Sequence, residues 1–188
     1  MNKTHKIMVA SDIHGSLYYT QKLYEAYLDE NPDMLLLLGD ILYHGPRNDL
    51  PRDYNPKGVI EILNGIKDNI RCVRGNCDAE VDQMVLDFPI MADYSIIMNG
   101  DLTIFVTHGH IFNTSNPPLL NKGDILLHGH THVPVLEYFG NDNIYINPGS
   151  VSIPKNGSCN SYMIIEDGNG IWKDITTRET YKKENLKK

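Results

Sequence analysis

Apolar and polar positions alternate differently in the two halves of the chain. In the first half, short apolar runs end in polar loops, and between them lie longer segments whose apolar residues recur every three or four positions. Strands that alternate with helices in this way favour a parallel sheet. We therefore predict a βαβαβ unit with strands near residues 5–11, 33–38 and 70–75 and helices over 16–32 and 57–70.

The second half reads as a series of short strands. Asn99 and Gly100 stand between two β-rich runs, and an Asn-Gly pair in this setting is a strong hairpin signal. Further apolar runs follow with turn residues between them, and from Tyr181 the sequence is rich in lysine and glutamate. We predict a mostly β second half that ends in a frayed, solvated tail over 181–188.

Length and composition fit one compact domain. The chain has 188 residues, of which 41% are hydrophobic, and no stretch has the composition of a linker. We assign residues 1–180 to a single domain of the α/β class.

Charge and apolar patterning narrow the choice of partner and compartment. The formal net charge of -7 disfavours non-specific binding to a nucleic acid backbone. The longest aliphatic run, Met34 to Leu38, is too short to span a membrane, and the first residues lack the features of a secretory signal. Cys72, Cys77 and Cys159 are scattered along the chain, as is typical of a reducing compartment. We expect a cytoplasmic protein without structural disulfides.

Nearly every unusual polar residue comes directly after an apolar strand. In α/β sheets, ligands bind at the carboxyl ends of the strands. Taken singly, each of these residues fits an ordinary role, such as a turn aspartate, a helix cap or a surface histidine. Their conjunction at strand ends that one sheet system can bring together favours a metal site. The polar clusters contain Asp12 and His14; Asp40; Asn76 and Asp78; His108 and His110; and His128, His130 and His132.

Five short motifs occur in order along the chain: DIH at 12–14, GD at 39–40, GNCD at 75–78, HGH at 108–110 and GHTH at 129–132. This ordered set resembles the signature of the calcineurin-like metallophosphoesterases. The segments GDILYHGPRNDLP, RGNCDAEVDQM and NPGSVSIPK further resemble the YfcE-type bacterial phosphodiesterases. The resemblance implies a sandwich of two packed β-sheets flanked by helices, with the site at the strand ends.

The resemblance also implies which residues hold metal. It indicates two divalent metal ions, with manganese as first choice and zinc or iron as alternatives. His128 matches no ligand of the family and His110 lies at best near the site, so we expect hydrogen-bonding or structural roles for both. The seven implied ligands are Asp12, His14 and His132 for one ion, Asn76, His108 and His130 for the other, and Asp40 as the bridge.

An enzyme of this family would hydrolyse phosphate esters, because two ions offset the charge of the ester and activate a bridging hydroxide. Two departures from the wider family bear on the substrate. Cys77 stands where many relatives carry the histidine that protonates the leaving group, and we expect a packing role for this thiol. Tyr43 and His44 stand where phosphoprotein phosphatases have an aspartate and an arginine. Both departures favour small organic phosphodiesters, whose leaving groups need little protonation.

The loop from Tyr43 to Gly58 is long and irregular, as many functional loops are. Its Arg47 is a candidate clamp for a phosphate oxygen, with His44 beside it, although Arg47 also fits the role of a solvated loop charge. Asp78 is expected to cap a turn or to hydrogen-bond the backbone.

Two other functions are compatible with the sequence. A eukaryotic retromer subunit shares the implied fold and works through protein contacts, so a protein-binding scaffold is one alternative; the retention of all seven ligand positions favours catalysis over it. A nuclease-like phosphoesterase would want a basic groove and aromatic platforms, which the net charge disfavours. We expect a small phosphodiester substrate, neither a membrane nor a nucleic acid as partner, and we leave a homo-oligomer open.

Overall fold

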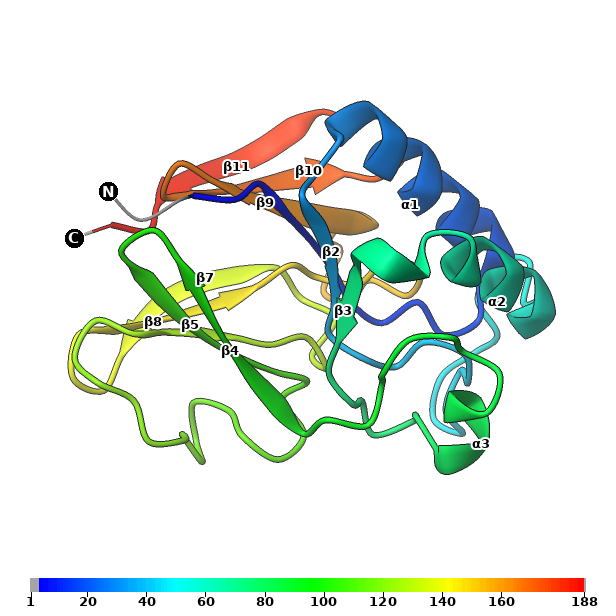
Figure 1. Cartoon of the computed structure of the whole chain (residues 1–188), viewed down its shortest axis with the longest axis horizontal. Helices are drawn as coiled ribbons and strands as arrows, with labels where there is room; N and C mark the ends of the chain where they lie inside the picture. The colour runs from blue at the N-terminus through cyan, green and yellow to red at the C-terminus, as the bar shows by residue number, and fades with distance from the viewer. Residues whose placement is uncertain (1–3, 188) are drawn as a thin grey trace.

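The computed structural model describes residues 4–187, and its strands form two sheets (Figure 1). The six-stranded sheet has the order β11-β10-β9-β1-β2-β3, and the five-stranded sheet has the order β4-β5-β6-β8-β7. Three α-helices and one 3-10 turn are described. The strands of the first sheet are β1 (Ile7–Ala10), β2 (Met34–Leu37), β3 (Ile70–Cys72), β9 (Ser161–Glu166), β10 (Asn169–Asp174) and β11 (Thr180–Asn185). Those of the second are β4 (Tyr94–Asn99), β5 (Leu102–Thr107), β6 (Ile125–Leu127), β7 (Val135–Phe139) and β8 (Asn143–Asn147). The helices are α1 (Leu17–Glu30), α2 (Pro56–Asn64) and α3 (Glu80–Gln83), with the turn η1 (Lys67–Asn69).

The predicted βαβαβ unit is confirmed, since β1, β2 and β3 pair in parallel and α1 and α2 connect them. The first helix begins where the hydroxyl of Ser16 accepts the N–H of Tyr19, and it ends at Asn31, whose φ of 47° is left-handed. The second helix stops at Asn64, before the predicted residue 70. A glycine follows there, and the chain continues into η1.

Alternate residues of β1 face two different hydrophobic cores. Met8 and Ala10 pack in the core beneath α1 and α2, whereas Ile7 and Val9 pack in the core between the two sheets. Figure 1 shows both long helices on the outer side of the six-stranded sheet. The implied sandwich of two sheets flanked by helices is therefore confirmed.

The predicted hairpin joins β4 to β5, but its turn lies one residue later than the Asn-Gly signal suggests. Asn99 pairs with Leu102, so Gly100 and Asp101 form the turn, and Gly100 has a φ of +62°. The side chain of Asn99 is instead hydrogen-bonded to the backbone N–H and carbonyl of His5, at 2.7 and 2.9 Å. The side chain of Asn99 therefore stabilises a contact with His5, 94 positions away in the sequence, and not the turn.

The expectation of a frayed tail from Tyr181 is wrong for the residues that the structure describes. Residues 180–185 form β11, which pairs antiparallel with β10 at the edge of the first sheet. Lys182 lies over the ring of Trp172, and Leu186 is buried in the core between the sheets. Only residue 188 of the predicted tail lies outside the described residues.

Within residues 4–187, no helix combines the length and the apolar character that crossing a bilayer requires. The three cysteines are free thiols.

The parallel strands of both sheets deliver their polar loops to one place. β1, β2 and β3 are parallel in the first sheet, and β5, β6 and β8 are parallel in the second. The loops that follow β1, β2, β3, β5 and β6 contain all seven predicted metal ligands. The fold therefore gathers at one edge the residues that the sequence scatters over 120 positions, from Asp12 to His132.

Candidate metal centre

A first group of side chains closes around Asp12. The Nε2 atom of His132 lies 3.2 Å from Asp12 Oδ1, and that of His14 lies 3.6 Å from the same oxygen. The two Nε2 atoms are 3.3 Å apart. Asp12 and His14 are completely buried, and His132 is 3% exposed. The three predicted ligands of one ion thus converge on one point.

A second group closes around His108. Its Nε2 atom lies 3.1 Å from Oδ1 of Asn76 and 3.2 Å from Nδ1 of His130. These are the three residues predicted for the other ion. His108 is completely buried, whereas Asn76 is exposed at the rim.

Asp40 lies between the two groups. Its Oδ2 atom is 3.7 Å from Nε2 of His14 in the first group and 3.5 Å from Nε2 of His108 in the second. Its other oxygen, Oδ1, accepts the backbone N–H of Cys77 at 2.8 Å. That hydrogen bond fixes the carboxylate so that one oxygen faces both groups, which is the placement a bridging ligand needs.

The hydrogen bonds behind the histidine rings fix the state of the nitrogens in front. The Nδ1–H groups of His14, His108 and His132 donate to the backbone carbonyls of Tyr43, Leu38 and Ile153 at 2.8, 2.6 and 2.6 Å. In the neutral ring, the proton therefore sits on Nδ1, and Nε2 presents a lone pair. Three lone pairs point into the two groups.

This arrangement fits divalent metal ions. Ligand atoms about 2.1 Å from one ion lie about 3.0 to 3.4 Å from one another in octahedral or tetrahedral geometry, close to the observed separations. Asp12 Oδ1 is buried without a hydrogen-bond partner, and the Nε2 atoms of His14 and His132 face each other with no proton between them when both rings are neutral. A cation satisfies all three atoms at once.

The pKa shifts in the site indicate that its carboxylates favour a positive charge beside them. Burial raises the pKa of the Asp12 carboxyl, but His132 and His14 hold that pKa well below its usual value. Burial lowers the pKa of His108, yet Asp40 and Asp12 raise it to about 9. The pKa of His130 falls to about 4 through burial and the proximity of His108. Ions bound here would displace the proton of His108, so metal uptake is coupled to proton release.

Five of the seven predicted ligands have left-handed backbone conformations. The φ angles are positive at Asp12 (59°), His14 (50°), Asp40 (56°), His130 (66°) and His132 (62°). Such conformations of non-glycine residues cost about 1 to 3 kcal/mol each and persist where the surrounding structure enforces them. The loops are therefore bent to aim these side chains inward.

Two glycines allow the loops to approach one another. A Cβ atom on Gly129 would lie 1.9 Å from Oγ of Ser11 and 2.8 Å from Oδ2 of Asp12. A Cβ atom on Gly75 would lie 2.1 Å from Oδ1 of Asp40. Neither position tolerates a side chain without displacing a predicted ligand.

Asp78 holds the backbone of Asp40, the predicted bridging residue. Its carboxylate accepts the N–H groups of Asp40 and Ile41, both at 2.9 Å, and that of Gly75 at 2.7 Å. The prediction that Asp78 hydrogen-bonds the backbone is confirmed. Because one buried carboxylate ties the loop after β2 to the loop after β3, it sets the position of Asp40 relative to Asn76.

The thiol of Cys77 lies beside the predicted ligands His14 and Asp40, but it is poorly suited to exchanging protons. Burial, together with the negative charge of Asp40, raises its pKa well above the usual range. Its Sγ atom accepts a hydrogen bond from Nδ2 of Asn76 at 3.2 Å, and a Cβ on Gly45 would lie 3.2 Å from it. The thiol therefore fills space at the wall of the site and orients the amide of Asn76.

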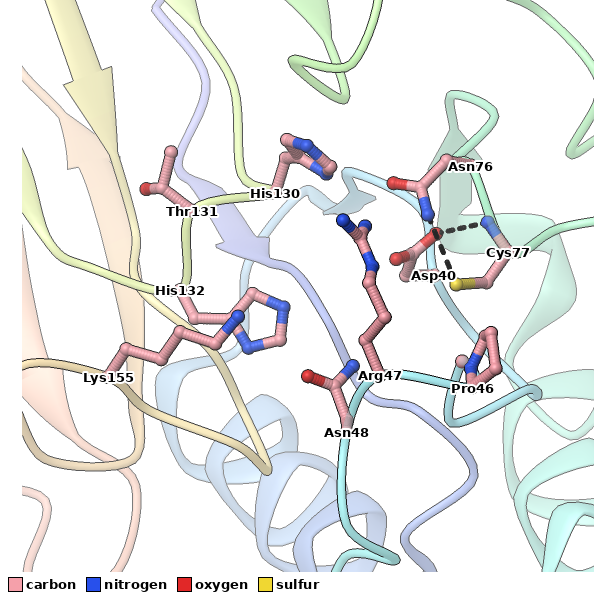
Figure 2. Close-up of a pocket in the computed structure, with 11 residues that line it drawn as sticks. Asp40, Pro46, Arg47, Asn48, Asn76, Cys77, His130, Thr131, His132 and Lys155 are labelled. Carbon is pink, nitrogen blue, oxygen red and sulfur yellow. Dashed lines mark hydrogen bonds between the residues drawn. The ribbon is translucent and has the colours of Figure 1, made fainter.

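A pocket of about 390 Å³ opens over these groups (Figure 2). Figure 2 shows the guanidinium of Arg47 pointing into its centre, toward His130 and Asp40. On the opposite side, the side chain of Lys155 lies alongside His132. Two exposed cationic side chains from different loops thus flank the predicted ligands.

Sequence reasoning missed Lys155 as a site residue. Its backbone N–H donates to the carbonyl of His132 at 3.1 Å, and the carbonyl of Ile153 accepts Nδ1–H of the same histidine. The segment before Lys155 therefore supports a predicted ligand from behind. The available signal was the motif NPGSVSIPK, which ends at this lysine.

The structure does not bring three other histidines into the ligand groups. His44, a predicted substrate-binding residue, is absent from the pocket lining; its ring packs edge-on against Tyr43 and Tyr54. His128 stacks on Tyr145 with 4.2 Å between ring centroids, and its pKa is lowered to about 4 by burial. His110 lies edge-on to His108 at 5.4 Å. Neither His128 nor His110 belongs to the two ligand groups.

Comparison with known proteins gives concordant matches. The family model described as calcineurin-like phosphoesterase superfamily domain matches residues 6–170, a span that contains all seven predicted ligands. Phosphodiesterase YfcE of Escherichia coli strain K12 is 48% identical over 162 residues, which cover 86% of this chain and 88% of that protein.

Solved structures agree with this result. The structure of YfcE, described as a phosphoesterase from E. coli, matches with a TM-score of 0.93 and 43% identity, covering 97% of this chain and 100% of that one. The Vps29 protein of Entamoeba histolytica, solved in complex with zinc, matches with a TM-score of 0.57 and 16% identity, covering 97% and 99%. Similarity at that level of identity concerns the fold alone.

Proposed function

We propose, from the premise that the chain belongs to the calcineurin-like phosphoesterase superfamily, that it is a dinuclear metal-dependent phosphodiesterase acting on small organic phosphodiesters. One observation carries the dinuclear assignment. Asp40 Oδ2 stands between two separate groups of inward-facing ligand atoms, 3.7 Å from His14 Nε2 and 3.5 Å from His108 Nε2. Each group would hold one ion, and Asp40 would be a ligand of both.

The residues of the chain would hold the two ions and the substrate in fixed positions. When bound, the ions supply the positive charge that offsets a phosphate ester and they acidify bound water. The backbone carbonyls behind His14, His108 and His132 keep the rings oriented, and Asp78 keeps Asp40 in place. The site is thus formed before substrate arrives, which lowers the reorganisation needed during the reaction.

Arg47 and Lys155 are the proposed phosphate-binding side chains. Both line the pocket, and they approach it from opposite loops. A guanidinium pairs well with two phosphate oxygens, whereas an ammonium acts as a point charge. We assign to Arg47 the orientation of the non-bridging oxygens and to Lys155 the stabilisation of negative charge beside His132. His44 packs outside the pocket lining, so in our proposal it supports the loop.

Manganese is our first choice of metal, and zinc and iron are alternatives. The converging atoms are imidazole nitrogens, carboxylate oxygens and one amide oxygen. Such a mixed set suits several first-row metals. We also propose that the protein works in the cytoplasm.

Restoring single metals to metal-stripped protein tests this function. Hydrolysis of bis(4-nitrophenyl) phosphate and of 4-nitrophenyl phosphate is measured with manganese, zinc or magnesium, in the wild type and in the His132→Ala and Asp40→Asn variants. We expect diester cleavage with manganese that falls at least about 100-fold in both variants. Folded wild-type protein that turns over neither ester with any metal would overturn the proposal and favour a protein-binding scaffold of the same fold.

A further inference from the structure

An apolar groove of about 410 Å³ adjoins the metal pocket. Its walls come from the loop after β2, the start of α2 and the segment around α3. Cys77 lines both cavities, so the groove begins one residue from the predicted ligand Asn76. We define the groove by its lining residues: Leu42, Tyr43, Tyr54, Pro56, Ile60, Cys77, Ala79, Val81, Asp82 and Val85.

The surface of the groove is apolar and exposed. Tyr43, Val81 and Val85 are 43%, 63% and 42% exposed. The single charged side chain of the lining, Asp82, has an oxygen that accepts the N–H of Ala79 at 2.9 Å. Exposed apolar side chains gathered beside a polar site indicate a surface that receives an apolar group.

The groove is preformed. Tyr54 packs beneath the backbone of Gly15, where a Cβ atom would lie 2.5 Å from its ring, and Leu42 is 5% exposed. On the other wall, the amide of Gln83 fastens α3 to the following segment through bonds to the carbonyls of Leu86 and Phe88. A rigid apolar surface binds a flat ring without a large loss of entropy.

We propose that this groove binds an aryl ester group of the phosphodiester substrate, and this inference rests on the proposed function. Cys77 lines both cavities, so the groove is continuous with the pocket over the predicted ligands. Tyr43 and Tyr54 give the groove two aromatic side chains beside its aliphatic ones. An aryl ring matches this apolar and aromatic lining.

The reaction that this assignment describes is balanced hydrolysis. Water forms a bond to phosphorus, and the bond between phosphorus and the aryl oxygen breaks. The aryloxide leaves with the electron pair of that bond, and the proton lost by water passes to solvent. The groove takes no part in these bond changes, because its role is to bind the ring.

Binding of two hydrolysis-resistant phosphonates tests the groove separately from catalysis. Phenylphosphonate and methylphosphonate are titrated calorimetrically into metal-loaded wild type, Val81→Asp, Val85→Asp and the control Met84→Asp. Met84 lies in the same turn and is 83% exposed, but it does not line the groove. We expect phenylphosphonate to bind about tenfold more tightly than methylphosphonate in the wild type and the control.

In Val81→Asp or Val85→Asp, we expect that preference to fall below about threefold while methylphosphonate affinity stays unchanged. A preference that survives in both variants overturns the inference. So does a groove variant that keeps the preference but changes the sedimentation of the protein, because the groove is then a contact between copies. Loss of the aryl preference in wild type, with methylphosphonate still bound and diesters still cleaved, refutes the groove alone. Failure to bind either phosphonate, with no diester turnover, refutes the proposed function and the groove with it.

Discussion

The Nε2 atoms of His14 and His132 lie 3.3 Å apart, and each ring already donates its Nδ1 proton to a backbone carbonyl. Two neutral imidazoles in this arrangement direct their lone pairs at each other. The contact is favourable only when a proton or a cation lies between them. With the unpartnered Oδ1 of Asp12 beside them, these atoms define the first of the two proposed metal positions.

Replacement of one ligand should remove one of two bound ions. We expect wild-type protein to bind two manganese or zinc ions, and His132→Ala to lose at least about 100-fold in affinity for one of them. Calorimetric titration and metal analysis after dialysis would measure this. His5→Ala is the matched control, since His5 pairs with Asp33 at the surface, away from the site. A variant that still retained two tight ions would contradict the assignment.

Asp78→Asn should weaken metal binding although Asp78 is not among the predicted ligands. An amide can accept with only one oxygen, so at least one of the N–H groups of Asp40, Ile41 and Gly75 loses its partner. We expect the free energy of unfolding to fall by about 2 to 3 kcal/mol and metal affinity to fall about 10- to 100-fold. Urea unfolding and metal titration provide the two values. Glu80→Gln, at an exposed position two residues away, should change neither.

Gly129→Ala should disrupt the site by steric contact alone. The φ of Gly129 is not left-handed, but the new Cβ would overlap Oγ of Ser11 and press on Asp12. We expect a loss of stability of about 2 to 4 kcal/mol, with impaired metal binding. Gly123→Ala is the control, because it has a φ of +84° and open space around it, so only about 1 kcal/mol of backbone strain is expected. Equal effects of the two substitutions would show that crowding at Gly129 is unimportant.

Arg47→Ala and Lys155→Ala should weaken substrate use without loss of metal. We expect each to lower kcat/KM for the diester by about 10- to 100-fold, since each removes one charged contact to phosphate. Steady-state kinetics would show this, with metal content measured in parallel. Lys122→Ala removes a surface charge that pairs with Asp142 and should leave kcat/KM unchanged. Wild-type kinetics in both pocket variants would rule out the proposed clamp.

Protonation of Glu30 at low pH should lower the free energy of unfolding. Burial raises the pKa of this carboxyl, but Lys173 and Lys6 lower it overall below its ordinary value. The folded state therefore binds fewer protons than the unfolded state. The stabilisation is complete above the unfolded pKa of about 4.3 and disappears as pH falls through the folded pKa. Glu30→Gln should cost about 1 kcal/mol at pH 7, allowing for solvent screening.

Denaturant unfolding of wild type and Glu30→Gln at pH 7 and at low pH tests this linkage. The difference between the two proteins should shrink on acidification, because both then carry a neutral side chain at this position. Glu61→Gln, at an exposed position on α2, should show no such change with pH. A difference that stayed constant with pH would assign the effect of Glu30 to packing instead of charge.

Local sequence patterns predicted the strands and helices in which buried apolar residues recur at regular spacing. The strands that precede Asp12, Asp40 and Asn76 are apolar runs that feed polar loops, and their parallel order follows from the helices between them. The same patterns placed ten polar candidates at strand ends, and the family resemblance selected from them the seven that the structure brings together. Neither the φ angles nor the hydrogen bonds behind the histidines could be read from local patterns, since both depend on contacts between distant loops.

The features that escaped prediction depend on tertiary partners. β11 is polar on both faces because it is an edge strand, and a charged edge strand has the composition of a solvated tail. Asn99 lies outside the turn, and its side chain is hydrogen-bonded to the backbone of His5. Lys155 enters the pocket only because its loop packs behind His132. In each case, the deciding partner lies far away along the chain.

The separation of His14 and His132 along the chain gives metal binding a mechanical consequence. These residues are 118 positions apart and belong to loops of different sheets. An ion held by both is a reversible cross-link that closes most of the polypeptide into one ring. For a permanent cross-link, a ring of about 100 residues restricts the unfolded chain by about 4.7 kcal/mol at most. Chelation of the metal should therefore speed cleavage of the polypeptide by proteases. The metal supply of the cell would then govern how long the protein survives as well as how fast it hydrolyses its substrate.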